Sequence, residues 1–266
     1  MNTAHTTSRA GATVSVVIPV KDDDDALRRC LQALRAQTRP ADEIVVVDNG
    51  SSDSSTEIAR AGGARVVPCD RPGIPAASSH GYDCATGDLI LRLDADCVPD
   101  STWIDSVIRA FAVRDDVGAF SGGARFIDGP SWLRAPLVMI YLGSYAAAAG
   151  SALGHLPLFG SNLAFRRAAW HRIRHRVHRN DDDLHDDLDL SFHLGELYRI
   201  RYLPGAAMGM SMRPFASKGA FLSRIAAGFR TVLVHWPHDF PPVRWTRMAM
   251  RRIRDRSGIR AALTLT

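Results

Sequence analysis

Two carboxylates close an apolar run in the first half of the chain. The run LILRL covers residues 89–93, and Asp94 and Asp96 follow it with a single alanine between them. In an extended segment, side chains at i and i+2 face the same side about 6–7 Å apart, so both acids could share one ligand. Mg²⁺ takes one or two carboxylates and completes its shell with water and substrate phosphates. The pair predicts a divalent cation, Mg²⁺ or Mn²⁺, with Asp96 as its ligand opposite a diphosphate.

A third acid ends an earlier apolar run. Asp48 closes EIVVVD, and the Asn49-Gly50 pair that follows is typical of a turn before a helix. Turn formation and helix capping account for residues 49–53. They account less well for Asp48, whose carboxylate could accept hydrogen bonds from a base or a ribose.

The hydropathy pattern predicts the frame that brings these acids together. Short apolar runs alternate with segments whose apolar residues recur at helical spacing. Strands are expected at 14–20, 43–48, 65–67, 89–93 and 117–120, and helices at 27–34, after Ser54, at 76–86 and at 104–111. Such alternation predicts an α/β protein with a mostly parallel sheet covered by helices on both faces. Ligands of these sheets bind outside the carboxyl ends of the strands, which is where all three acids lie.

A second acidic group lies much later in the chain. The segment HDDLDLSFHLGELYRIRYLPG, residues 185–205, has apolar residues at helical spacing and places Asp186 and Asp187 in the first turn of the helix. Acids there interact favourably with the helix dipole, so a purely structural role is one interpretation.

These segments occur in the order found in the glycosyltransferases of family 2. The chain resembles that family over residues 14–204, through VSVVIPV, QTRPADEIVVVDNGSSD, GIPAASSHGYDCATGD, LDADCVPDSTW, FGSNLAFRR and DDLDLSFHL. The resemblance implies a GT-A fold with a helical C-terminal acceptor-side region. It also implies a metal-dependent transfer of a sugar from a nucleotide-sugar donor to an acceptor hydroxyl, with inversion.

The resemblance also assigns roles to single residues. It implies donor binding by Pro19, Val20, Asp48, Gly73 and Asp94. It implies that Asp96 binds the metal, that Asp187 is the catalytic base, and that Asn162 and Asp186 lie on the acceptor side. A carboxylate base fits this chemistry, because a sugar hydroxyl is a poor nucleophile until its proton is taken.

The chain departs from the family pattern at several positions. Lys21-Asp22 stands where Tyr-Asn is common, and Ser78-Ser79 where Arg-Asn is common. The QxxRW motif of processive members is absent, although its last two residues have a counterpart in Arg244-Trp245. The absence of the full motif favours addition of single sugars. A non-catalytic nucleotide-sugar-binding or membrane-associated module therefore stays an alternative. A sugar nucleotidyltransferase is a weaker one, because PVKDDDD is not the Gly-rich, Arg-containing loop expected after its first strand.

Length and composition indicate an ordinary globular chain. It has 266 residues, of which 46% are hydrophobic and 23% charged. We predict a disordered tail at 1–12, a nucleotide-sugar-binding half at 13–123, an acceptor-binding and catalytic half at 124–215, and a basic helical extension at 216–266. The cysteines show no CxxC spacing and no apolar leader follows Met1, so a cytoplasmic protein with free thiols is expected.

Basic residues crowd the C-terminal region. The net charge is +5, and arginines recur from Arg244 to Arg260 without a nucleic-acid-binding motif, so no nucleic acid partner is expected. They favour peripheral contact with an anionic membrane and a saccharide or lipid-linked acceptor. The weakly apolar stretch Ala135–Gly154 predicts a buried or surface-lying helix rather than a span. His171, His175 and His178 lack a cysteine or a fourth histidine at structural-zinc spacing, and we expect them at the surface.

Overall fold

The computed structural model describes residues 11–215 and 218–263, and residues 1–10 of the predicted tail lie outside this part. The strands are β1 (Val14–Val20), β2 (Glu43–Asp48), β3 (Arg65–Pro68), β4 (Leu89–Arg92), β5 (Val98–Pro99), β6 (Val117–Phe126), β7 (Leu163–Arg166) and β8 (Arg199–Met210). The α-helices are α1 (Asp24–Arg35), α2 (Ser55–Ala61), α3 (Ile74–Cys84), α4 (Trp103–Val113), α5 (Ser131–Leu153), α6 (Arg167–Ile173), α7 (Asp186–Leu197), α8 (Lys218–Val234) and α9 (Pro241–Leu263). Short 3-10 turns η1 (Gly160–Asn162) and η2 (Arg213–Phe215) complete the set.

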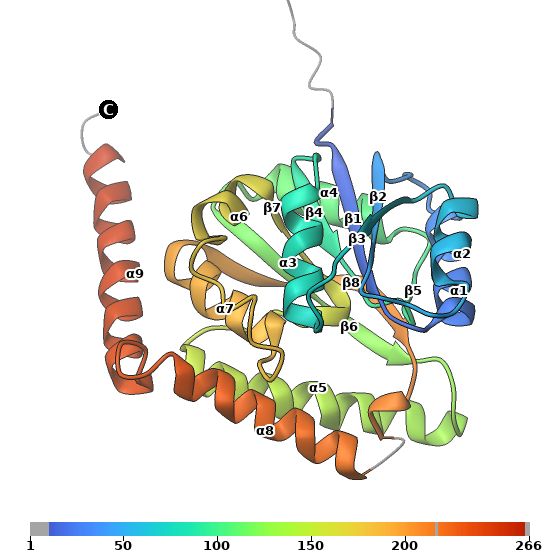
Figure 1. Ribbon diagram of the computed structural model, residues 1–266. Coiled ribbons are helices and arrows are strands. Elements are labelled where there is room, and N and C mark those ends of the chain that lie inside the picture. The colour runs from blue at the N-terminus through green and yellow to red at the C-terminus, as the bar shows by residue number, and fades with distance from the viewer. Residues whose placement is uncertain (1–10, 216–217, 264–266) are drawn as a thin grey trace, which may run out of the picture.

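The strands form one eight-stranded sheet in the order β3-β2-β1-β4-β7-β6-β8-β5. The pairs from β3 to β4 are parallel, as is β6 with β8, whereas β4–β7, β7–β6 and β8–β5 are antiparallel. The sheet is therefore parallel in the half that carries the first acids and mixed in the other half. Figure 1 shows helices packed around this sheet, with α5 and α8 below it.

Both faces of the sheet are buried, and β1 shows why. Its alternate residues point to opposite faces, so Val16 and Ile18 join one apolar cluster and Val17 joins another. The first cluster contains residues of α1, α2 and α4, and the second contains residues of α3, α6 and α7. The predicted α/β class with helices on both faces is confirmed.

The turn that carries the first acid pair differs from the expected extended segment. Strand β4 ends at Arg92, and the Cys97 amide donates to the Asp94 carbonyl at 3.0 Å, which closes a turn. Asp94 and Asp96 therefore do not face one side of a strand, and their separation is set by the turn.

Helix α5 contains the apolar stretch noted in the sequence. It contacts β6, α7 and α9, and its length and composition would suffice to cross a membrane. Only 22% of its most apolar window is buried, and Trp132, Met139 and Ile140 are exposed. One such helix is weak evidence of a span, and the contacts with the protein fit the predicted surface-lying helix.

Arg244 departs from the predicted surface position of the C-terminal arginines. Its side chain is fully buried, and its Nε and Nη2 donate to the carbonyls of Leu153 at 2.8 Å and Phe192 at 2.9 Å. Its Nη1 pairs with Asp239 at 2.8 Å. The physical reason is that these carbonyls lie where helices α5 and α7 meet α9, and a guanidinium with five donors can satisfy several of them. The side chains of Arg252, Arg254, Arg256 and Arg260 lie outside the described residues.

Candidate active site

A cleft of about 640 Å³ opens at the carboxyl ends of β1 and β4. Its walls include Pro19 and Val20 at the end of β1, together with the acids Asp94, Asp96, Asp186 and Asp187. The opposite wall comes from α5 and α8. The volume lies in the usual range for a small-molecule site, about 300–1,000 Å³. The structure thus brings both acidic groups of the sequence into one cavity, although they lie about ninety positions apart.

A buried arginine links the two acidic groups. The Arg92 side chain is 3% exposed, and its Nη2 lies 2.9 Å from the Asp94 carboxylate and 3.5 Å from that of Asp186. Burial works to lower the pKa of Arg92, but the charges of Asp186 and Asp94 outweigh it and raise that pKa. Arg92 is therefore the cation that compensates the acids at the end of β4. The sequence analysis missed it, although a charged residue inside an otherwise apolar strand is a usable signal.

A second arginine neutralises Asp96. Arg213 in η2 places Nη2 2.8 Å from the Asp96 carboxylate and 2.5 Å from that of Asp23. Burial and the charge of Asp94 raise the pKa of Asp96, while the contact with Arg213 opposes them. Asp94 has other partners than Asp96. It pairs with Arg92 and accepts a 2.6 Å hydrogen bond from the Ser161 hydroxyl.

The donor set around Asp96 fits a hard divalent cation. The carboxylates of Asp94 and Asp96 and the sulfur of Cys97 offer ligand atoms within 4.8 Å of one another. Burial raises the pKa of Cys97 well above its ordinary value, with Asp94 and Asp96 adding to the effect. Cys97 is therefore a protonated thiol and a poor ligand, and the remaining oxygens are those that Mg²⁺ and Mn²⁺ prefer.

Asp187 is the second residue of helix α7 and faces the same cleft. Its Oδ2 accepts a 2.8 Å hydrogen bond from the Gly160 amide, and its Oδ1 accepts one of 2.7 Å from the Leu188 amide. Burial raises the pKa of Asp187, and the charge of Asp186 raises it further. A Cβ at Gly160 would lie 2.0 Å from Arg92, so only glycine lets this backbone approach. A fixed carboxylate with a raised pKa has the properties of a general base.

Two predicted donor-binding residues, Asp48 and Gly73, are not among the residues that line the cleft. The Asp48 carboxylate accepts hydrogen bonds from the Ser51 amide at 2.9 Å and the Thr56 hydroxyl at 3.1 Å, so it serves the turn before α2. Gly73 donates its amide to the Asn49 side chain at 2.9 Å. From the sequence, Asn49 was expected to stabilise the turn and Asp48 to bind the ligand. In the structure, the Asp48 carboxylate makes hydrogen bonds that stabilise the turn, and Asn49 lines the cleft.

The predicted acceptor-side residue Asn162 is buried. Its side chain is 3% exposed and donates to the carbonyls of Gly123 at 2.8 Å and Ala206 at 2.6 Å. It also accepts a 2.9 Å hydrogen bond from the Trp103 indole. These contacts use both amide protons, and the neighbouring Ser161 is the residue of this turn that lines the cleft.

Comparison with known proteins settles the family. The family model described as "Glycosyl transferase family 2" matches residues 15–173, which is more than half of the 266-residue chain. The chain belongs to this family. The matched range contains Asp94 and Asp96 and ends before Asp187, so the assignment of the base depends on the geometry of the cleft and on the motif around it.

Curated and solved relatives agree with this placement. The glycosyltransferase AglE of Haloferax volcanii is 35% identical over 100 residues, which are 35% of this chain and 33% of that protein. The chain thus matches about a third of the length of the curated relatives that head the comparison.

Solved structures extend the likeness over most of the chain. A mannosyltransferase of Pyrobaculum calidifontis, solved with GDP-Man and Mn²⁺, has a TM-score of 0.62 at 18% identity, covering 97% of this chain and 82% of that one. Glucosyl-3-phosphoglycerate synthase of Mycobacterium tuberculosis, solved with Mn²⁺ and UDP, has a TM-score of 0.56 at 20% identity, covering 85% and 80%. These likenesses confirm the GT-A fold of the family 2 chain.

Proposed function

We propose that this chain transfers a single sugar from a nucleotide-sugar donor to an acceptor hydroxyl, with inversion at the anomeric carbon. The observation that carries the proposal is the place of Asp187. It is a buried carboxylate with a raised pKa, and it lines the same cleft as the Asp94 and Asp96 pair. A donor diphosphate beside the acid pair would present its sugar towards the base.

The donor side is formed by the first half of the sheet, and we assign residues 13–123 to it. The backbone at Pro19 and Val20 and the side chain of Asn49 line the cleft where a nucleotide would bind. Asp96, with Asp94 beside it, would hold a divalent cation, Mg²⁺ or Mn²⁺. That cation would neutralise charge on the departing diphosphate, so no general acid is needed.

The base step follows from the geometry around Asp187. As the acceptor oxygen bonds to the anomeric carbon, its proton passes to the Asp187 carboxylate and the bond to the diphosphate breaks. The Gly160 and Leu188 amides hold the carboxylate in one orientation throughout. One in-line displacement leaves the product with inverted configuration.

The acceptor side comes from residues beyond 123, which we assign to the acceptor-binding half and the helical extension. Tyr141 and Tyr145 of α5 and Arg224 of α8 line the cleft. Both helices also expose large apolar side chains, among them Met139 at 74% and Phe229 at 69%. These surfaces support a lipid-linked acceptor and peripheral attachment to a membrane face.

Single-sugar transfer is supported by the C-terminal pair Arg244-Trp245. Arg244 is buried among carbonyls of other helices, and the indole of Trp245 donates to the Ser151 carbonyl at 2.8 Å. Neither residue lines the cleft, so this Arg-Trp pair does not act there as part of the QxxRW motif of a processive enzyme.

Donor screening tests the proposal directly. Nucleotide sugars with and without Mn²⁺ would be compared by thermal shift, since a ligand at a hundred times its Kd stabilises a protein by about 2.7 kcal/mol. We expect one donor class to stabilise the protein only with the cation, and slow release of nucleoside diphosphate when acceptor or water is supplied. Stabilisation without any turnover, with lipid and saccharide acceptors present, would favour the non-catalytic binding module.

A further inference from the structure

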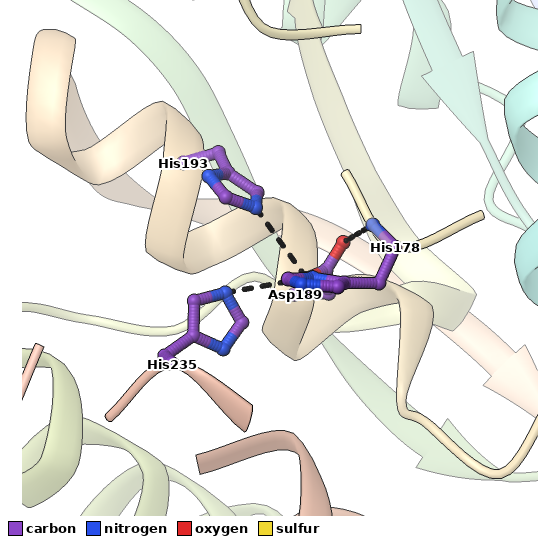
Figure 2. A group of neighbouring side chains, drawn as sticks. All are labelled: His178, Asp189, His193 and His235. Atoms are coloured by element: carbon purple, nitrogen blue, oxygen red, sulfur yellow. Dashed lines mark hydrogen bonds and ion pairs between the residues drawn. The ribbon is translucent and has the colours of Figure 1, made fainter. Parts of the chain in front are cut away.

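Three histidines surround the carboxylate of Asp189, which lies on α7, the helix that also carries the proposed base Asp187. Asp189 and His193 lie on α7, His178 lies in the segment between α6 and α7, and His235 follows the last residue of α8. Figure 2 shows the three rings pointing towards the Asp189 carboxylate. Each residue offers one ligand atom, and these atoms all lie within 4.8 Å of one another. Asp189 and His193 belong to the DDLDLSFHL segment, but none of the four cluster residues lines the cleft.

The spacing of the atoms suits a tetrahedral cation. Zinc bonds nitrogen and oxygen at about 2.0–2.2 Å, so two ligand atoms of one tetrahedron are about 3.3–3.5 Å apart. The Nε2 atoms of His193 and His235 lie 3.5 and 3.3 Å from the same Asp189 oxygen. His178 Nδ1 lies 2.7 Å from that oxygen, at hydrogen-bond distance. Binding of a cation would therefore release a proton from His178 and widen this one contact, as metal binding to histidine generally does.

The tautomer of His235 points to the same conclusion. Its Nδ1 lies 2.7 Å from the Thr231 carbonyl oxygen, and because a carbonyl cannot donate, this nitrogen must carry the proton. In the neutral ring, Nε2 then turns a lone pair towards the Asp189 carboxylate. Two facing lone pairs repel each other unless a cation, or a second proton on the ring, lies between them. An imidazole whose other nitrogen donates to a backbone carbonyl is the usual arrangement of a metal ligand.

Burial increases the need for such a cation. The side chains of Asp189, His193 and His235 are 6%, 9% and 3% exposed. Within the part of the chain that the structure describes, the Nε2 atoms of His193 and His235 have no hydrogen-bond partner of good geometry. Among the described residues, the ion pairs of Asp189 all go to these histidines, so with neutral rings the carboxylate has no compensating charge. A buried charge without compensation is costly.

We propose that Asp189, His178, His193 and His235 form a second metal centre, a closed structural site for Zn²⁺ or a similar divalent transition metal. Four protein ligands leave no open coordination position, which distinguishes a structural site from a catalytic one. Imidazole nitrogens favour Zn²⁺ over the Mg²⁺ and Mn²⁺ that suit the carboxylates near Asp96. His178, 35% exposed, lies at the outer edge and gives the ion a path of entry.

The site joins three segments that the sequence keeps apart. It connects the helix that begins with Asp186 and Asp187 to the preceding segment and to the turn between α8 and α9. Phe192 stacks on the His235 ring at a centroid distance of 4.0 Å, which fixes that ring against α7. The centre would thus hold the C-terminal helices against the helix that carries the base. Of the three histidines expected at the surface, His171 and His175 are exposed and His178 is partly buried, with its side chain 35% exposed.

Cobalt substitution tests the proposal in the full-length protein with any purification tag removed. The protein would be stripped with a chelator and titrated with Co²⁺, whose tetrahedral complexes have intense visible bands that octahedral ones lack. We expect these bands to saturate at about one Co²⁺ per chain and zinc to displace the cobalt. Wild-type protein that develops no tetrahedral bands would overturn the proposal and leave a histidine with a second proton as the compensating charge.

Variants distinguish this centre from the donor site. His193→Gln and His235→Gln should each abolish the tetrahedral bands, whereas the exposed control His175→Gln should keep them. Asp96→Asn should also keep them, because it removes only the carboxylate site. Unchanged bands in both cluster variants, or bands lost in Asp96→Asn, would refute the assignment. The wild-type spectrum decides the question even if a variant folds poorly.

Discussion

The guanidinium of Arg213 lies 2.8 Å from the carboxylate of Asp96, across 117 positions of sequence. The arginine thus lies where a cation bound to Asp96 would compete with it. Arg213 also pairs with Asp23, so it connects η2 to the loop after β1. It is half exposed, which leaves it able to move aside when another positive charge arrives.

Replacing Arg213 by glutamine should tighten binding of Mn²⁺ in the absence of nucleotide. A partly exposed ion pair contributes about 1 kcal/mol or less, so we expect an affinity about twofold to fivefold higher. Isothermal titration with Mn²⁺ measures it. The matched control is Arg109→Gln, which removes a surface pair with Asp105 and should change nothing. Weaker Mn²⁺ binding in the Arg213 variant would show that the arginine supports the cation site.

Replacing Asp96 by asparagine should remove the dependence of donor binding on the cation. The diphosphate would then face Asp94 with no cation between them, and we expect donor affinity with Mn²⁺ to fall at least about tenfold. Calorimetry with UDP- and GDP-sugars, with and without Mn²⁺, compares the two states. Asp105→Asn is the surface control. An unchanged affinity in the presence of Mn²⁺ would leave the Asp94–Cys97 segment as a structural turn.

Replacing Asp187 by asparagine tests the base. Asparagine can still accept from the Gly160 amide but cannot take a proton, so turnover should fall by about 10²–10⁴-fold while donor affinity stays near wild type. Single-turnover transfer and donor calorimetry measure the two quantities. Asp115→Asn, at a side chain that is 92% exposed, is the control. Transfer at nearly the wild-type rate would assign the proton to another acid, with Asp186 examined first.

The sequence predicted the parts of this molecule that local patterns determine. Val14–Val20 alternates between two buried faces, so its strand and the crevice at its end follow from hydropathy alone. Asp48, Asp94 and Asp96 were expected at one crevice because parallel strands end at a common edge. The role of Asp187 came from the resemblance to the family.

The remaining site residues depend on contacts between distant segments. Arg213 meets Asp96 only because β8 pairs with β5 and carries η2 to the cleft. Asp48 was assigned to the ligand because the sequence does not show that Ser51 and Thr56 occupy its carboxylate. In the histidine cluster, Asp189 and His193 lie at i and i+4 on α7, but His178 and His235 come from two other segments, so sequence spacing does not mark the whole set.

Stability should depend on acidic pH through Glu43. Burial works to raise the pKa of Glu43, but hydrogen bonds from Ser15, Arg65 and Thr86 outweigh it and lower that pKa from 4.5 to about 2. A depressed folded-state pKa stabilises the protein above pH 4.5, and the stabilisation is lost as the pH falls from 4.5 towards 2. Its full value is roughly 2–3 kcal/mol.

Glu43→Gln should therefore lower the free energy of unfolding at pH 7 and flatten its dependence on pH between 4.5 and 2. Urea unfolding at several pH values measures both effects. The exposed Glu57→Gln is the control and should reproduce the wild-type curve. A Glu43 variant that loses stability in parallel with the wild type over this range would contradict the assignment.

The final prediction concerns Arg244, which the sequence suggested for a membrane surface. Its buried guanidinium pairs with Asp239 and donates to the carbonyls of Leu153 and Phe192. Arg244→Met would leave both carbonyls without this donor and leave Asp239 paired with Arg247 alone. Breaking a buried pair costs about 3–5 kcal/mol, and at about 2–4 °C per kcal/mol the melting temperature should fall by roughly 6–20 °C. Scanning calorimetry measures this, with the exposed Arg109→Met as control. Retention of anionic vesicles should be the same in Arg244→Met as in wild type at a temperature where both are folded. A variant of normal stability that loses vesicle binding would restore the membrane role.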